Sequence, residues 1–190
     1  LHDNIGSSLT EISIWSEIIR KKIKNPEKDI EKSLQMISNN SRNLIDNMSD
    51  IVWLVNPKRD TLYDLILRLR DTYSELSSYT SISFKSENIK ALEKVTLSIE
   101  HRQHLYLILK EAINNRITHS NCTEISLDAF VKGRKLEMVL SDNGSGFSHT
   151  ESKGNGLENI KNRAKTIGGI LLINSEPGKG TTIRFEGNIL

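Results

Sequence analysis

Glycine is distributed so unevenly along this chain that it divides the sequence into two parts. Of the 11 glycines, Gly6 stands alone near the start, and the other ten lie at Gly133 or beyond. A long stretch without glycine favours helices, whereas clustered glycines supply tight turns and close backbone approaches. We therefore expect a mainly helical part up to residue 132, followed by a part that also contains strands and tight turns.

The first 57 residues have the apolar spacing of a coiled coil, with four- and three-residue steps before and after Pro26. The short turn around Pro26 predicts that the two helices fold back as an antiparallel hairpin. The seam consists of Ile5, Leu9, Ile12, Ile19, Ile23, Ile30, Leu34, Ile37, Leu44, Met48, Ile51 and Val55, with interruptions at Ser16 and Ser41. One hairpin covers so long a seam poorly. We therefore expect a homodimeric four-helix bundle, and less readily a hairpin packed on the rest of its own chain.

Residues 58–190 alternate between helical and strand patterns. Asn56-Pro57 should end the second helix, because the residue before a proline avoids helical geometry. The periodicity predicts helices at 59–76, 101–120 and 158–169, and strands at 81–87, 124–131, 135–141, 170–175 and 181–186. The expected fold class is α+β, with helices on one face of a mixed sheet.

Composition excludes several classes of function. The 26 basic and 24 acidic residues give a formal net charge of +2, so there is no strong basic field to hold nucleic acid. Cys122 is the single cysteine, which excludes an intrachain disulfide and fits a reducing cytosol. No apolar run approaches the ~20 residues that span a bilayer. We expect a cytoplasmic location, with any membrane anchor lying upstream.

Four motifs in the second part carry the chemistry. On a helical wheel, Glu111, Asn115 and His119 share one face of a helix, with His104 beside them. The motif DNGSGF places an acid and two glycines at the end of a predicted strand, while KGNGLENI and GKGTT add further glycine turns. Each motif is weak evidence alone, because short glycine motifs recur by chance. Their order and spacing together are much more specific.

The stretches EAINNRITHS, DNGSGF, KGNGLENI and GKGTT resemble the N box and glycine boxes of the Bergerat ATP-binding fold, which histidine kinases share with gyrase, Hsp90 and MutL. The segments LHDNIGSSL and MSDIVWLVNP resemble the phosphoacceptor hairpin of bacterial two-component sensor histidine kinases. The His-Asp start is most similar to the subfamily that pairs with response regulators of the LuxR/NarL type. The resemblance implies a dimerisation and phosphotransfer domain at 1–57 and an ATP-binding domain at 58–190.

The resemblance also implies an activity and its residues. A protein-histidine kinase would phosphorylate His2 from ATP with Mg²⁺ and pass the group to an aspartate of a response regulator. His2, Asp3 and Glu111 are then the expected catalytic residues, and Asn115 the Mg²⁺ ligand. Asp142 would accept the amino group of adenine. The remaining expected nucleotide-binding residues are His119, Gly144, Gly146, Gly154, Gly156, Leu157, Gly180, Thr181 and Thr182.

Three positions depart from the family pattern. Arg116 stands where an alanine usually follows the Mg²⁺-binding asparagine, and it falls on the apolar arc of its helix. A charge there lowers stability unless it finds an acidic partner, so we expect an alanine at this position to be stabilising. The competing interpretation is that Arg116 reaches the phosphates, because Thr118 replaces a lysine that is common there. Ser7 replaces a glutamine associated with dephosphorylation of the partner, which leaves phosphatase activity open.

The sequence leaves three alternative functions open. A member of the same family with impaired nucleotide binding would act as a dimeric signalling scaffold, and Arg116 and Thr118 favour that reading. A serine kinase or ATPase of the same superfamily would act on an external target, but the His-Asp hairpin argues against it. A zinc site at Glu111, Asn115 and His119 is less favourable, because asparagine is a poor zinc ligand.

Overall fold

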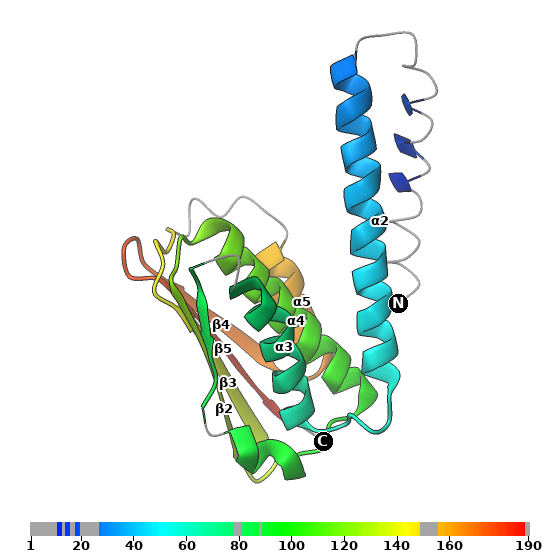
Figure 1. The fold of residues 1–190 in the computed structure, drawn as a ribbon. Coiled ribbons are helices and arrows are strands. Elements are labelled where there is room, and N and C mark those ends of the chain that lie inside the picture. Colours follow the sequence, from blue (N-terminus) through cyan, green and yellow to red (C-terminus); the bar gives the residue numbers. More distant parts are fainter. Residues whose placement is uncertain are drawn as a thin grey trace. The chain divides into compact units, whose positions relative to one another are not determined.

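The computed structural model describes residues 11–12, 14–15, 18–19, 27–77, 81–87, 89–148 and 156–188 (Figure 1). The chain divides into two compact units, Leu1–Asn56 and Pro57–Leu190. This division falls one residue before the boundary expected from the Asn56-Pro57 step. Among the described residues, no helix is long and apolar enough to cross a membrane.

The first unit contains helix α2 (Glu27–Val55), and the described residues between 11 and 19 are also helical. The helix α2 ends directly before Asn56-Pro57, as predicted. Of its expected seam, Leu44 is buried, whereas Met48 and Val55 are 53% and 49% exposed. Val52, which the predicted seam did not include, is 68% exposed. The side chains of Ile5, Leu9, Ser16, Ile23, Leu34 and Ser41 lie outside the described residues.

The second unit is built on a five-stranded sheet in the order β1-β2-β3-β5-β4. Its strands are β1 (Ser83–Lys85), β2 (Glu124–Lys132), β3 (Lys135–Asp142), β4 (Ile170–Ser175) and β5 (Thr181–Asn188). The strand β1 runs parallel to β2, and the other neighbours are antiparallel. Helices α3 (Leu62–Ser77), α4 (Ile99–His119) and α5 (Gly156–Thr166) lie on one face of this sheet (Figure 1). The expected mixed sheet and its helical layer are confirmed, whereas the short 3-10 helix η1 (Ile89–Lys94) was not predicted.

Alternation along the strands separates a buried face from an open one. On the side of the helices, Leu136, Met138 and Leu140 of β3 are buried and pair in register with residues of β5. Asp142 ends this inward series at the last position of β3. Because strand side chains alternate with a period of two, its carboxylate is directed into the layer between sheet and helices. The fold therefore places the carboxylate of Asp142 at a position that continues a series of buried apolar side chains.

The helix α4 covers this end of the sheet and is held at both of its ends. Ser98 caps its first turn by accepting a hydrogen bond from the His101 amide at 3.1 Å. At the other end, the Ser120 amide donates to the Arg116 carbonyl at 3.0 Å. With its ends fixed, the helix presents Glu111, Asn115 and Arg116 at fixed positions above the sheet.

Candidate functional site

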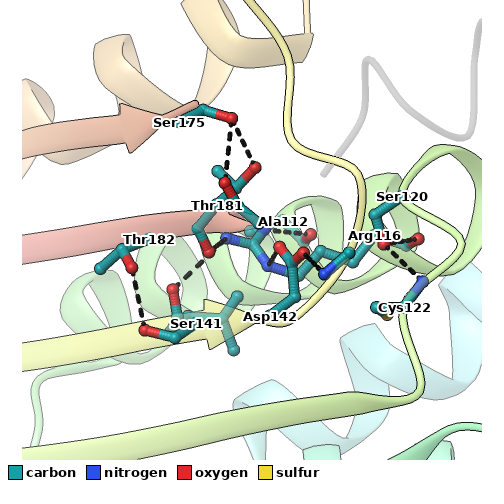
Figure 2. Close-up of polar contacts among 12 residues, drawn as sticks. Ala112, Arg116, Ser120, Cys122, Ser141, Asp142, Ser175, Thr181 and Thr182 are labelled. Atoms are coloured by element: carbon teal, nitrogen blue, oxygen red, sulfur yellow. Dashed lines mark hydrogen bonds and ion pairs between the residues drawn. The ribbon is translucent and has the colours of Figure 1, made fainter. Parts of the chain in front are cut away.

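A buried ion pair joins α4 to the end of β3. Arg116 Nε lies 3.0 Å from Asp142 Oδ2, and the two side chains are 4% and 0% exposed (Figure 2). Asp142 Oδ1 accepts a hydrogen bond from the Gly144 amide at 2.8 Å, which fixes the orientation of the carboxylate. The arginine in the apolar arc has therefore found an acidic partner, and the premise that it is unpaired is wrong.

The guanidinium of Arg116 is also bonded to backbone carbonyls on three elements. One terminal nitrogen donates to Ala112 at 2.7 Å, and the other lies 3.3 Å from the Leu140 carbonyl and 3.5 Å from the Thr181 carbonyl. Burial lowers the pKa of Arg116 to about 10, and the nearby Asp142 opposes that shift. At neutral pH the side chain is therefore charged. In this arrangement its donors go to protein groups at the Asp142 end of the site.

Asp142 Oδ2 is a buried acceptor that receives no hydrogen bond from any residue the structure describes. Its contact with Arg116 is an ion pair without hydrogen-bond alignment, since Arg116 Nε also lacks a hydrogen-bonding partner there. Buried polar atoms in proteins are normally hydrogen-bonded, so an exception calls for an explanation. A carboxylate oxygen of this kind fits the amino group of a nucleotide base, but the arginine already lies against it.

The glycines of DNGSGF and GKGTT pack against the chain itself. A Cβ atom at Gly144 would collide with the Ser120 carbonyl, and one at Gly180 would collide with the Asp142 carbonyl. Gly180 also has φ of 77°, in the left-handed region that favours glycine. These residues let the loop after β3 close on the end of α4 and on the β4–β5 turn. The sequence interpretation had assigned the same glycines to the approach of a ligand.

A second group of polar side chains lies where α4 meets the start of α5. Asn115 Nδ2 donates to Glu111 Oε1 at 3.3 Å, and both residues are half-buried. Gly156 begins α5 against this pair, and a Cβ atom there would lie 2.6 Å from Glu111 Oε1. A carboxylate and an amide oxygen are the hard ligands that Mg²⁺ prefers. This group therefore fits a Mg²⁺-phosphate end of a nucleotide site.

Two of the remaining predicted residues lie near these groups. His119 is exposed on the last turn of α4, and Leu157 is half-buried in the first turn of α5. His2, Asp3, Ser7 and Gly154 fall outside the described residues. The expectations for these four stay predictions.

The two threonines of β5 point to opposite faces of the sheet. Thr181 pairs in register with Asp142 on the buried side, and its hydroxyl lies 2.8 Å from the Ser175 hydroxyl. Thr182 belongs to the other face, where its hydroxyl lies 3.1 Å from that of Ser141 (Figure 2). The structure therefore brings Thr181 but not Thr182 to the Asp142 side. The period of two along a strand already separates the two side chains.

Ser175 is a residue that sequence reasoning missed. Its hydroxyl accepts a hydrogen bond from the Phe147 amide at 2.9 Å and contacts the Gly180 carbonyl at 3.3 Å. It therefore ties the loop after β3 to the turn before β5. A serine at the end of a strand carries no specific sequence signal, so only the fold reveals this role.

Comparisons with known families match both parts of the chain. The family model described as "Histidine kinase-, DNA gyrase B-, and HSP90-like ATPase" matches residues 100–187, and the model described as "Histidine kinase" matches residues 1–60. The sensor histidine kinase LiaS of Bacillus subtilis is 25% identical over 98% of this chain and 51% of LiaS. The sensor protein VraS of Staphylococcus aureus is 28% identical over 98% of this chain and 52% of VraS. The chain thus spans about half the length of these relatives.

Solved structures show the same fold. The histidine kinase AdeS of Acinetobacter baumannii matches with a TM-score of 0.63 and 12% identity, over 100% of this chain and 98% of that one. The histidine kinase domain of the Erythrobacter litoralis blue-light activated kinase matches with a TM-score of 0.64 and 15% identity, over 95% and 96% of the two chains. With a match to the histidine kinase model at residues 1–60 followed by a match to the ATPase model at residues 100–187, the chain has the two modules of a sensor histidine kinase core.

Proposed function

We propose that this chain is the catalytic core of a two-component sensor histidine kinase, which phosphorylates His2 from ATP and passes the phosphoryl group to an aspartate of a response regulator. The observation that carries the proposal is the order of the two matched modules, with His2 in the first and the Glu111, Asn115 and Asp142 groups in the second. The His-Asp start of the first module favours a regulator of the LuxR/NarL type.

The Mg²⁺-phosphate end of the site is suited to this chemistry. The amide oxygen of Asn115 would hold Mg²⁺, with the Glu111 carboxylate beside it at hydrogen-bond distance from the same amide. Gly156 brings the first turn of α5 to this pair, and backbone N–H groups at a helix start favour phosphate oxygens. When bound, Mg-ATP supplies the γ-phosphoryl group, and transfer then depends mainly on positioning and charge neutralisation.

At the other end of the reaction, a neutral imidazole nitrogen of His2 is the nucleophile. The new N–P bond forms as the bond from the γ-phosphorus to ADP breaks, and the ring gives up its remaining proton or shares it with a base. Asp3 directly follows His2 and would orient the ring by accepting its other N–H. The two residues form one functional unit in this proposal, because the tautomer of the ring decides which nitrogen is free to attack.

The proposed active form is a homodimer through residues 1–57. Met48, Val52 and Val55 follow one another at helical spacing along α2 and are all exposed in the single chain. Large exposed apolar stripes of this kind are typical of interaction surfaces. A second copy of the same hairpin would cover them in a four-helix bundle.

A specific observation favours a second candidate function. Asp142 is held by Arg116, so the group that would recognise adenine is not free. If a chain with this arrangement bound no nucleotide, it would act as a dimeric scaffold that transmits a signal without transferring a phosphoryl group. Binding of Mg-ATP distinguishes the kinase from the scaffold.

The proposed activity is tested by incubation with γ-labelled ATP and Mg²⁺, followed by treatment of the labelled protein with acid and with base. A phosphohistidine is labile in acid and stable in base. The variant His2→Gln should lose the label, while the matched control His101→Gln, which alters another histidine, should keep it. Full labelling of His2→Gln would remove His2 from the mechanism.

A further inference from the structure

We propose that Arg116 competes with the nucleotide base for the carboxylate of Asp142, and thereby sets both the affinity of the domain for ATP and its preference for adenine. The inference rests on the proposed ATP-binding function. It concerns the Asp142 end of the site, which is separate from the Glu111 and Asn115 pair.

The carboxylate of Asp142 has one oxygen left for a ligand. The Gly144 amide occupies Oδ1 at 2.8 Å, and Arg116 Nε lies 3.0 Å from Oδ2. The side chain of Asp142 is 0% exposed, so water does not screen the pair. Arg116 carries a full positive charge 3.0 Å from the buried carboxylate, whereas the amino group of a base is neutral, so the electrostatic attraction to Oδ2 is larger for the arginine. The arginine is therefore the stronger partner, and a base must displace it or bind without Oδ2.

Several contacts hold Arg116 in this position. Its terminal nitrogens donate to carbonyls of Ala112, Leu140 and Thr181, which belong to α4, β3 and β5. A guanidinium that moved away would break these bonds and leave the carbonyls buried. The same contacts argue against a role for Arg116 at the phosphates, because in this position its terminal nitrogens already donate hydrogen bonds to backbone carbonyls.

Occupation of Oδ2 should also weaken base selection. A free carboxylate oxygen attracts the amino group of adenine and repels the carbonyl oxygen that guanine presents at the equivalent position. With Arg116 beside it, the negative charge of Asp142 is balanced and this discrimination is reduced. We therefore expect the unaltered chain to bind Mg-ATP weakly and to bind Mg-GTP with similar affinity.

The experiment is calorimetric titration of Mg-ATP and Mg-GTP into the unaltered chain and into Arg116→Ala, Arg116→Met and Arg116→Ala/Asp142→Asn. Both single variants should bind Mg-ATP at least tenfold more tightly, and their ratio of ATP to GTP affinity should rise at least tenfold. Methionine keeps most of the side-chain volume without the charge, so its gain would come from the freed carboxylate. The added Asp142→Asn should cancel the gain.

Several outcomes would overturn the competition. Unchanged or weaker ATP binding in both single variants would do so. A gain in the alanine variant alone would also do so, because it would show that the smaller side chain, and not the loss of the positive charge, improves ATP binding. A strong preference for Mg-ATP over Mg-GTP in the unaltered chain would also contradict the proposed competition. This measurement needs no variant, so the proposal can be tested even if a variant fails to fold. Loss of His2 labelling with a normal gain in ATP binding would defeat only the proposed kinase activity. Absence of binding in every protein would defeat both.

Discussion

Arg116 Nε lies 3.0 Å from Asp142 Oδ2 in a layer where the two side chains are almost completely shielded from solvent. Their charges come from different elements, one from α4 and one from the last position of β3. Removing one member of such a pair leaves the other buried without a partner, which typically costs about 3–5 kcal/mol. The pair therefore links the stability of the second unit to the chemistry of its candidate site.

The first prediction is that Arg116→Ala lowers the melting temperature in the absence of nucleotide, by an amount on the order of 10 °C. The alanine leaves Asp142 unpaired and removes the three bonds to backbone carbonyls. This reverses the expectation from sequence, which treated the arginine as an unpaired charge. Thermal melts followed by circular dichroism measure the change.

Two further variants make that prediction specific. Arg70→Ala alters an exposed arginine on α3 and should change the free energy of unfolding by less than about 0.5 kcal/mol. Adding Asp142→Asn to Arg116→Ala should recover part of the loss, because a neutral amide tolerates burial better than a lone carboxylate. A melting temperature that rises in Arg116→Ala would show that the pair does not stabilise the fold.

The helices and strands were largely predictable from the sequence because they depend on local patterns. The apolar pattern located α3, Gly168-Gly169 marked the end of α5, and Asn56-Pro57 marked the end of α2. The partner of Arg116 was not predictable in this way, because Asp142 lies 26 positions further along the chain and on another element. The helical wheel showed only that the arginine faces inward.

In the candidate site, too, some contacts follow from the local sequence and others depend on how distant elements pack. The proximity of Glu111 and Asn115 follows from one turn of helix, and their hydrogen bond agrees with that geometry. The contact of Gly156 with Glu111 depends on how α5 docks on α4, for which the sequence holds no local signal. Thr182 is a different case, since strand alternation by itself assigns its side chain to the open face of the sheet.

The second prediction concerns pH and His104. Its Nδ1 atom is buried and has no hydrogen-bond partner among the residues described. Burial lowers the pKa of His104 below the ordinary value of 6.5, Arg163 and His101 lower it further, and Glu100 opposes them. Below about pH 6.5 the unfolded chain therefore binds a proton before the folded chain does, so stability should fall as the pH drops through this range.

Urea midpoints measured at pH 7.5, 6.5 and 5.5 would reveal this effect. In His104→Gln the decline between pH 6.5 and 5.5 should be shallower than in the unaltered chain. The matched control is His119→Gln, which changes an exposed histidine on the same helix. Equal slopes in the unaltered chain and His104→Gln would assign the acid sensitivity to other groups.

The third prediction is that α2 mediates dimerisation through its exposed apolar stripe of Met48, Val52 and Val55. Met48→Glu should shift the chain from dimer to monomer at micromolar concentration, because a charge in an apolar seam is left without water or partner. Asn43→Glu is the control, since Asn43 is exposed and lies on the opposite side of α2 from Val52. Light scattering of the three proteins decides, and a monomeric unaltered chain would defeat the dimer.

The last prediction uses the contact between Gly156 and Glu111. In Gly156→Ala the new Cβ atom would lie 2.6 Å from Glu111 Oε1 and 3.5 Å from Asn115 Nδ2, so the carboxylate has to move. Gly156 is the first residue of α5 and does not have a positive φ, and alanine has fewer conformations than glycine in the unfolded chain, so the melting temperature should not fall.

Labelling of His2 from Mg-ATP, in contrast, should fall at least tenfold in Gly156→Ala if Glu111 and Asn115 position the phosphate end. The control is Asn162→Ala, which introduces alanine at an exposed position of the same helix. Nucleotide binding should weaken in the presence of Mg²⁺ but change little in its absence, because the Asp142 end of the site is untouched. Normal labelling in Gly156→Ala would mean that Glu111 can shift without loss of activity. If the melting temperature fell together with the labelling, the variant would have a folding defect.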